Sequence, residues 1–180
     1  MAKKFIGTEG NDYYEGENGV DDIQGLGGND HLLGLGQDDV IDGGDGNDRL
    51  KGGTGDDLLI GGLGSDVLVA GLGEDTMIGG LGRDIYNLGF GSEADTVVIQ
   101  SVAETTLGLA DQVNGFVAGQ DKIDISALVA AGADFQIVNG ASASAIKIDG
   151  NGNGLFNEIG IDGRIQVGGA PTLAVTDLIT

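Results

Sequence analysis

A single large apolar residue recurs at every ninth position through the first half of the chain. These residues are Tyr14, Ile23, Leu32, Ile41, Leu50, Leu59, Leu68, Met77 and Tyr86. Each is the middle one of three residues that follow a glycine-rich stretch of six. Because side chains alternate between the two faces of a strand, the middle residue points to one side and its two neighbours to the other. The pattern predicts nine short strands, each with its apolar residue turned inward.

The nine-residue units run without insertion from Gly7 to Asn87. A repeat of fixed length is typical of a solenoid, in which copies stack on one another. Two strands that face each other enclose one thin apolar core, so one coil needs two units, or about 18 residues. We therefore predict an all-β parallel β-solenoid, or β-roll, of about 4.5 turns, in which each unit stacks on the unit two places later.

The six-residue turns carry the candidate chemistry. Their last residue is always aspartate: Asp12, Asp21, Asp30, Asp39, Asp48, Asp57, Asp66, Asp75 and Asp84. Glycines permit the positive φ angles that bring backbone carbonyl groups together. The glycines predicted to do so at a metal are Gly43, Gly44, Gly46, Gly52, Gly53, Gly55, Gly61, Gly62, Gly64, Gly71, Gly73, Gly79, Gly80 and Gly82. Stacked carboxylates repel one another without a cation, and carboxylate and carbonyl oxygens together suit Ca²⁺ better than Mg²⁺.

The first four units match this pattern less closely than the last five. The second position becomes glycine only from Gly44 onward, and Gln37 replaces the glycine at the fourth position of one unit. Ala70 is the one substitution of the first glycine. We expect the N-terminal turns to bind metal less tightly.

Composition and charge support a folded, cation-binding chain. The 180 residues include 29 Asp and Glu against 8 Lys and Arg, which gives a net charge of −21 and makes nucleic acid and anionic membrane poor partners. The 37 glycines accompany 40% hydrophobic residues, which argues against a disordered glycine-rich segment. No stretch approaches the roughly 18 apolar residues of a membrane span. The alternatives left open are a metal-free β-solenoid and a disordered acidic linker.

The periodicity ends near residue 96, because Asp95 falls out of phase with the aspartates before it. We therefore divide the chain into residues 1–96, with repeats over 7–87, and residues 97–180. The stretches AIKIDG and EIGIDGRIQV predict antiparallel strands, and ISALVAAG predicts one or two helical turns. We expect this β-rich second region to cap the solenoid, whose parallel stacking ends at Asp95 and whose last strands would otherwise be exposed edges.

The repeat GGxGxDxUx, in which U is the large apolar residue, resembles the RTX nonapeptide of calcium-binding proteins. The resemblance implies a right-handed parallel β-roll that holds about 5–7 Ca²⁺ ions between its turns, with room for one more ion in the C-terminal region. It also implies a chain that is disordered in low cytosolic calcium and folds outside the cell.

Residues 110–128, ADQVNGFVAGQDKIDISAL, resemble the segment after the β-roll in serralysin-type secreted proteins. In that family an aspartate placed like Asp111 helps to close the last calcium turn, although Asn114 here replaces an acidic residue. Asp121 and Asp124 are expected to cap turns or strand ends. The resemblance implies a secreted, extracellular bacterial protein, exported by a type I secretion apparatus that reads an uncleaved C-terminal signal. The last four residues, DLIT, are similar to that family's terminus.

A second candidate metal site lies in the stretch DGNGNG. It offers Asp149, Asn151 and Asn153 at alternating positions, with Glu158 as a further ligand. The EF-hand needs an acidic residue at position 12 of the loop, where this chain has Gly160, so that motif is excluded. The alternative is a hairpin turn rich in Asx residues that binds no ion.

No catalytic constellation is evident. His31 is the only histidine, so zinc sites built from several histidines are impossible. We expect no enzyme within this chain, but a secreted calcium-binding module that supports type I secretion and extracellular stability. The alternative functions are a C-terminal module of a larger secreted enzyme, such as a protease, lipase or mannuronan C5-epimerase, and a surface-layer or matrix assembly protein.

The outward strand positions become apolar in the later units. Leu58 and Ile60 are expected to stack beneath Thr76 and Ile78 on one face. On the other face, Val67 and Val69 are expected to stack beneath Ile85 and Asn87. Apolar patches of this kind are seldom left in water. We therefore expect residues 97–180 to cover at least one patch, which leaves the other for a partner or for self-association.

Overall fold

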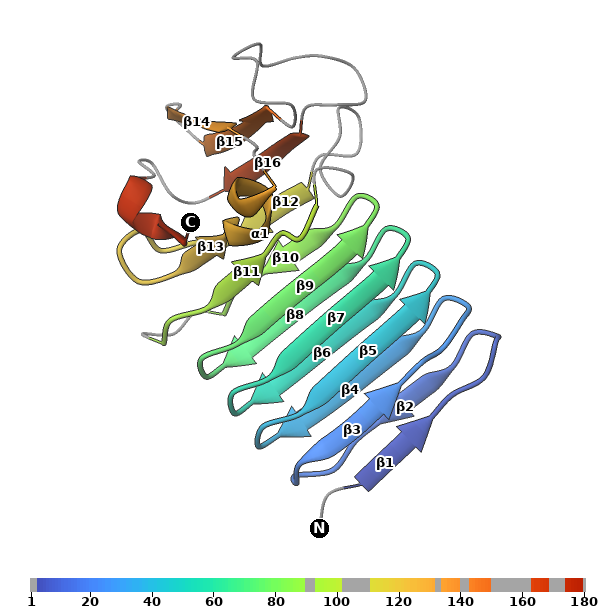
Figure 1. Cartoon of the computed structure of the whole chain (residues 1–180). Coiled ribbons are helices and arrows are strands. Elements are labelled where there is room, and N and C mark those ends of the chain that lie inside the picture. The colour runs from blue at the N-terminus through green and yellow to red at the C-terminus, as the bar shows by residue number, and fades with distance from the viewer. Residues whose placement is uncertain are drawn as a thin grey trace.

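The computed structural model describes residues 3–89, 93–101, 111–131, 134–139, 143–149, 163–168 and 174–179. Within them the chain is mostly strand and forms a parallel β-solenoid of about five turns (Figure 1). The strands alternate between two sheets along the repeats. The fold predicted from the periodicity is therefore confirmed.

The two sheets run the length of the solenoid. The first contains, in order, β1 (Lys3–Ile6), β3 (Asp21–Gln24), β5 (Val40–Asp45), β7 (Leu58–Leu63), β9 (Thr76–Leu81), β11 (Thr96–Val98), β13 (Lys122–Asp124) and β17 (Leu178–Ile179). The second contains β2 (Tyr13–Glu15), β4 (His31–Gly36), β6 (Arg49–Thr54), β8 (Val67–Leu72), β10 (Ile85–Asn87), β12 (Asp111–Asn114), β16 (Gly163–Gly168), β15 (Ala143–Asp149) and β14 (Asp134–Asn139). Neighbouring strands pair in parallel, except that β15 pairs antiparallel with β14 and β16.

The register confirms that one coil contains two units. Ile23 lies opposite Ile41, and Ile41 lies opposite Leu59, so equivalent residues stack at every second unit. The predicted inward residues form the core, except that Tyr14 in the first unit is only partly buried. Ile23, Leu32, Ile41, Leu50, Leu59, Leu68, Met77 and Tyr86 are fully buried. Because each strand contributes a layer only one side chain thick, each coil depends on its neighbours for its stability.

The parallel stacking does not end at Asp95, so that expectation is wrong. β11 and β13 continue the first sheet, and β12 continues the second with Val113 opposite Tyr86. The period of nine fails because residues are added between the strands: 20 positions separate Asp75 from Asp95, and 26 separate Asp95 from Asp121. The strands keep their places in the sheets although the spacing of their aspartates changes.

The smaller C-terminal elements agree with the predicted local structure. The helix α1 (Ser126–Ala130) lies in the stretch ISALVAAG, and β15 covers the start of AIKIDG. A short 3₁₀ helix, η2 (Val175–Asp177), leads into β17, which pairs with β13. Among the described residues, no helix is long and apolar enough to cross a membrane.

The turns use positive φ angles at their second and fourth positions. Gly44 and Gly46 have φ angles of 99° and 141°, which glycine adopts readily. Leu26, Leu35 and Gln37 occupy the same positions in earlier units, with φ angles of 77°, 84° and 67°. A left-handed conformation costs a residue with a Cβ about 1–2 kcal/mol. The third and fourth units therefore adopt the glycine-type turn under strain.

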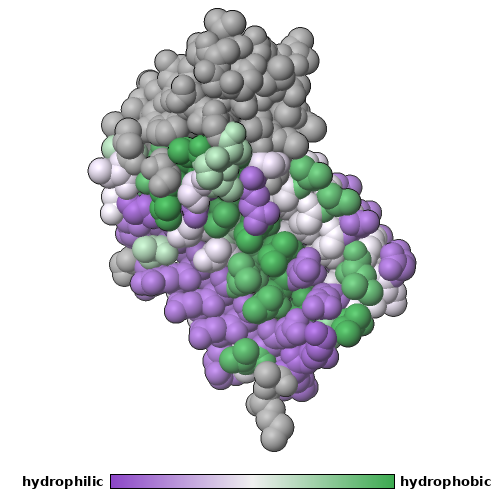
Figure 2. Space-filling model, viewed as in Figure 1, coloured by the Kyte–Doolittle hydropathy of each residue, from purple (hydrophilic) through white to green (hydrophobic). Residues whose placement is uncertain are grey.

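The outward apolar residues stack as predicted. Leu58 and Ile60 lie opposite Thr76 and Ile78, and all four are partly exposed. Figure 2 shows hydrophobic side chains gathered in the middle of the visible face of the solenoid. The labelled C-terminal elements lie at the end of the solenoid, beyond β10 and β11 (Figure 1). The expected packing of residues 97–180 on these faces is therefore not found among the described residues.

Replacing Leu26 by glycine should stabilise the folded state. Leu26 is 43% exposed, so little packing is lost, while the strain of its positive φ is removed. We expect a gain of about 1 kcal/mol in the free energy of unfolding, measured by thermal or urea denaturation at saturating Ca²⁺. Leu26→Ala, which keeps the strain, is the control. Equal stabilities of the two variants would contradict the strain argument.

Candidate metal centre

Each repeat places its aspartate at the last position of the turn, directly before the strand. This position is buried although the side chain is acidic. Asp21, Asp30, Asp39, Asp48, Asp57, Asp66, Asp75 and Asp84 are each at most 3% exposed. A buried carboxylate needs hydrogen bonds or a cation to offset the loss of its hydration. The neighbours of its two oxygens therefore decide what the turn can do.

From Asp30 onward, one oxygen of each carboxylate accepts a hydrogen bond from the coil before it. The backbone N–H of Asp48, for example, donates to Oδ1 of Asp66 at 2.7 Å. The same bond, at 2.7–3.1 Å, joins successive aspartates within each of two columns. One column is Asp12, Asp30, Asp48, Asp66, Asp84 and Asp111, and the other is Asp21, Asp39, Asp57, Asp75, Asp95 and Asp121.

The other oxygen has no hydrogen-bond donor in the middle of the solenoid. The Oδ2 atoms of Asp30, Asp39, Asp48, Asp57, Asp66 and Asp75 are buried and unpaired. A Cβ added at Gly43 would collide with Oδ2 of Asp48 and would lie 2.8 Å from the carbonyl oxygen of Gly61 in the next coil. The glycine at the first position thus keeps open a small space between a carboxylate oxygen and a carbonyl oxygen of the stacked turn.

The electrostatics of this space favour a positive charge. Burial raises the pKa of Asp39 to about 6 and the pKa values of Asp57 and Asp66 to about 7. The carboxylates of adjacent coils raise these pKa values further, while the backbone hydrogen bond opposes the rise. Burial also raises the pKa of Asp48 and Asp75. Without a cation, these carboxylates would hold protons at far higher pH than an ordinary aspartate.

The donor set fits calcium. In the part of the chain that the structure describes, no three side chains of His, Cys, Asp or Glu converge on one point. A cation in a turn would therefore be held by one carboxylate from each turn, together with backbone carbonyl oxygens. Calcium accepts such all-oxygen, irregular sets of six to eight ligands, whereas Mg²⁺ demands a tighter octahedron. His31 is the first residue of β4, where its ring contacts the ring of Tyr13.

The C-terminal candidates have different outcomes. Oδ1 of Asp111 accepts the N–H of Asp84 at 2.9 Å, so Asp111 lies in the aspartate column. Asp124 accepts the N–H of Ser126 at 2.8 Å, which agrees with the expected role of a turn cap. Asp149 is the last residue of β15, and Asn151, Asn153 and Glu158 lie outside the described residues.

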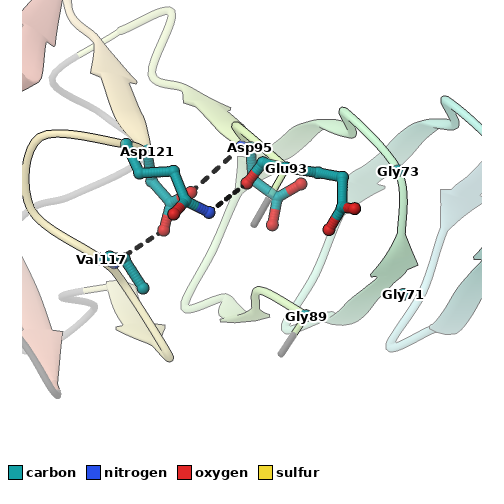
Figure 3. Close-up of a pocket in the computed structure, with 8 residues that line it drawn as sticks. Gly71, Gly73, Gly89, Glu93, Asp95, Val117 and Asp121 are labelled. Atoms are coloured by element: carbon teal, nitrogen blue, oxygen red, sulfur yellow. Dashed lines mark hydrogen bonds between the residues drawn. The ribbon is translucent and has the colours of Figure 1, made fainter. Parts of the chain in front are cut away.

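Asp95 is a column residue that sequence reasoning missed. Its Oδ1 accepts the N–H of Asp75 at 3.0 Å, and its own N–H donates to Oδ1 of Asp121 at 3.1 Å. Figure 3 shows the pocket beside this turn, where Asp121 also accepts the N–H of Val117 at 2.7 Å. The signal was an aspartate one residue before an apolar strand, DTVV, and a strict period of nine hid it.

A second ladder, on the exposed rim of the turns, was also missed. The N–H of Asn29 donates to Oδ1 of Asn11, and the N–H of Asn47 donates to Oδ1 of Asn29, at 2.8 and 2.7 Å. The N–H of Asp56 donates to Oδ1 of Asp38 in the same way. The signal is an Asn or Asp at the fifth position of the first unit and of the third to sixth units. This ladder ties stacked turns together without metal.

Comparisons with known proteins agree with this geometry. A family model of the RTX calcium-binding nonapeptide repeat matches residues 6–41, 15–50, 33–68 and 60–92. No curated protein matches the chain.

Two solved structures are similar over most of the chain. An extracellular lipase from Serratia marcescens is 15% identical with a TM-score of 0.42, and the match covers 100% of this chain and 40% of the lipase. A subunit of the mannuronan C5-epimerase from Azotobacter vinelandii is 18% identical with a TM-score of 0.31, and the match covers 99% of this chain and 77% of that subunit.

The raised pKa values predict how the calcium-free chain responds to pH. The folded state binds more protons than the unfolded chain between the ordinary aspartate pKa of 3.8 and about 7. Its free energy of unfolding therefore falls as the pH rises through this window. In EGTA we expect more β-signal by circular dichroism at pH 5 than at pH 7.5.

Protons and Ca²⁺ should compete for the same carboxylates, so the calcium midpoint should rise by about tenfold or more from pH 7.5 to pH 5. Asp57→Asn/Asp66→Asn, which removes two groups whose pKa values are raised to about 7, should show a weaker dependence. A β-signal in EGTA that grows with pH would contradict the electrostatic argument.

Proposed function

We propose that this chain is a secreted module whose β-roll folds when Ca²⁺ occupies its turns. The proposal starts from residues 6–92, which match the RTX calcium-binding nonapeptide repeat. Repeats of this family bind Ca²⁺, and the solenoid they build is a structural calcium-binding module. The observation that carries the proposal is the buried, unpaired Oδ2 atom that recurs in six consecutive units. A cation is the partner that such an oxygen lacks.

We assign the ligands of each ion to two stacked turns. The Oδ2 atom of the aspartate in one turn and the carbonyl oxygen of the first residue in the stacked turn face the same space, as Asp48 and Gly61 do. Further carbonyl oxygens of the turn glycines would complete the shell. Six ions would reduce the net charge of −21 to about −9, which a small soluble domain tolerates.

Calcium binding would then be coupled to folding. A preformed site of stacked turns does not exist in the unfolded chain, so binding free energy becomes folding free energy. Removing Ca²⁺ leaves six buried carboxylate oxygens without a donor, each at a cost of about 1–3 kcal/mol or more. That cost is comparable to the whole stability of a small domain.

We propose that residues 97–180 cap the C-terminal end of the roll. The contacts that support this role join the last residues to the turn before β13. Asp177 is buried and accepts the N–H groups of Gly119 and Ala174, at 2.7 and 2.8 Å. The N–H of Ile125 donates to the carbonyl oxygen of Ile179 at 2.9 Å. β17 therefore covers the edge that β13 would otherwise expose.

We propose further that the chain acts outside a bacterial cell after type I secretion. RTX repeats are typical of secreted proteins. Low cytosolic calcium would keep the chain unfolded during export, and external calcium would fold it. Asp177 and Leu178, in the segment proposed as the secretion signal, are buried in the folded chain. The apparatus would therefore read this segment before the chain folds.

A calcium titration tests the proposal. In EGTA at pH 7.5 we expect the far-UV circular dichroism of a disordered chain, and added Ca²⁺ should produce β-signal in a cooperative transition. Mg²⁺ at the same concentration should not replace it. A calcium-free chain with full β-signal and a cooperative thermal transition would refute calcium-coupled folding.

Deleting residues 174–180 tests the capping role. The deletion exposes the edge of β13 and removes both hydrogen bonds to Asp177, so we expect the calcium midpoint for folding to rise by about tenfold. Thr176→Ala, which changes an exposed side chain in the same segment, is the matched control. An unchanged midpoint in the deleted chain would show that this segment does not stabilise the roll.

A further inference from the structure

The first two aspartates of the repeat differ from the others in their hydrogen bonds. Oδ2 of Asp12 accepts the N–H of Thr8 at 2.6 Å and its hydroxyl group at 2.9 Å. Oδ2 of Asp21 accepts the N–H of Glu17 at 2.8 Å. In the next six units the same oxygen is buried and unpaired. The first two units thus satisfy from their own backbone the atom that the later units leave open.

The backbone at the second position of the turn explains this difference. In the third to ninth units this residue has a positive φ, which ranges from 77° at Leu26 to 139° at Gly71. Thr8 and Glu17 occupy the position in the first two units and are not among the residues with positive φ. Their N–H groups face the aspartate of their own turn, where the space for a cation would be. The sign of φ at the second position therefore distinguishes an open turn from a closed one.

We infer that Asp12 and Asp21 are hydrogen-bond acceptors that close the first coil and are not calcium ligands. The inference rests on the proposed function, because it concerns which turns of a calcium-binding roll take up the ion. The first coil then forms a metal-independent N-terminal cap, and the calcium sites begin at the third unit.

The remaining oxygen of Asp21 fits this assignment. Its Oδ1 is buried and unpaired. In later coils Oδ1 accepts the N–H of the aspartate one coil earlier, but that place is taken by Lys3, whose N–H donates to the carbonyl oxygen of Val20 at 3.1 Å. Oδ1 of Asp21 therefore lacks a donor because Asp21 is the first aspartate of its column.

Other contacts close the first coil without metal. The rings of Phe5 and Tyr14 stack at 4.0 Å with an angle of 14° between their planes, and both pack against the end of the core. Lys4 pairs with Asp22 at 2.8 Å, which ties β1 to β3. Aromatic stacking contributes about 0.5–1.5 kcal/mol, and exposed ion pairs contribute less. Lysines on an edge strand also discourage pairing with other chains.

Asparagine substitutions in the full-length chain separate the two kinds of aspartate. Asp12 and Asp21 each use one oxygen as an acceptor, so the amide oxygen of asparagine can replace it. Asp48 and Asp57 lie in the same two columns, and each uses Oδ1 in the ladder and leaves Oδ2 for the ion. Asparagine cannot do both. These two residues are the matched controls.

The number of bound Ca²⁺ ions should be measured by isothermal titration calorimetry and by native mass spectrometry. We expect Asp12→Asn and Asp21→Asn to bind as many ions as the original chain, with calcium midpoints within about twofold. Asp48→Asn and Asp57→Asn should each lose at least one ion and shift the midpoint by about tenfold or more.

Loss of an ion in Asp12→Asn or Asp21→Asn would overturn the inference, and so would failure of either variant to fold at saturating Ca²⁺. Failure of the proposed function has a different signature, because the original chain would then bind no Ca²⁺ at all. Full binding by the original chain with an ion lost from Asp12→Asn would overturn the cap alone.

Discussion

The structure depends on one constraint, the burial of a carboxylate in every turn of the roll. An aspartate at the end of each turn lets its Oδ1 atom accept the N–H of the equivalent aspartate in the previous coil, and this bond fixes the register of the stack. The same burial leaves a second oxygen that the backbone of the open turns does not satisfy. This second oxygen needs a partner. The partner can be a bound cation, a proton on the carboxylate, or a backbone N–H of the same turn.

The glycine pattern follows from that constraint. A Cβ at Gly43 or Gly61 would collide with the aspartate oxygen of its own turn, and Gly7 and Gly16 are equally crowded, so the first position favours glycine in open and closed turns alike. The second position must adopt a positive φ so that its N–H does not close the same oxygen. The core is only one side chain deep in each strand, which leaves little hydrophobic free energy to offset repulsion between carboxylates. Cation binding, turn conformation and core thickness are thus parts of one arrangement.

The sequence was sufficient where the repeat is strict. Position eight of each unit predicted the core, and a coil of two units predicted that Ile23 would lie opposite Ile41, because both follow from alternation and a fixed period. It was insufficient where structure is set by backbone geometry. Asp95 joins its column although extra residues separate it from Asp75. The hydrogen bond requires only that Asp95 lie beside Asp75 in space, whatever the number of residues between them. The closed turns at Thr8 and Glu17 depend on a φ angle that the repeat consensus does not encode.

The conformation of the turn, set at its second position, therefore changes along the length of the roll. Thr8 and Glu17 close their turns, Leu26 and Leu35 open them under strain, and the glycines from Gly44 onward open them without strain. Strain in the metal-free turn must be offset by the ion that binds there, so intrinsic affinity should be lowest in the third and fourth units and higher beyond them. The weakest sites then lie next to a coil that closes without metal. The first coil would therefore still cover the end of the roll when the adjacent ions are lost. It also means that fewer turns are open to calcium than the nine repeats would suggest.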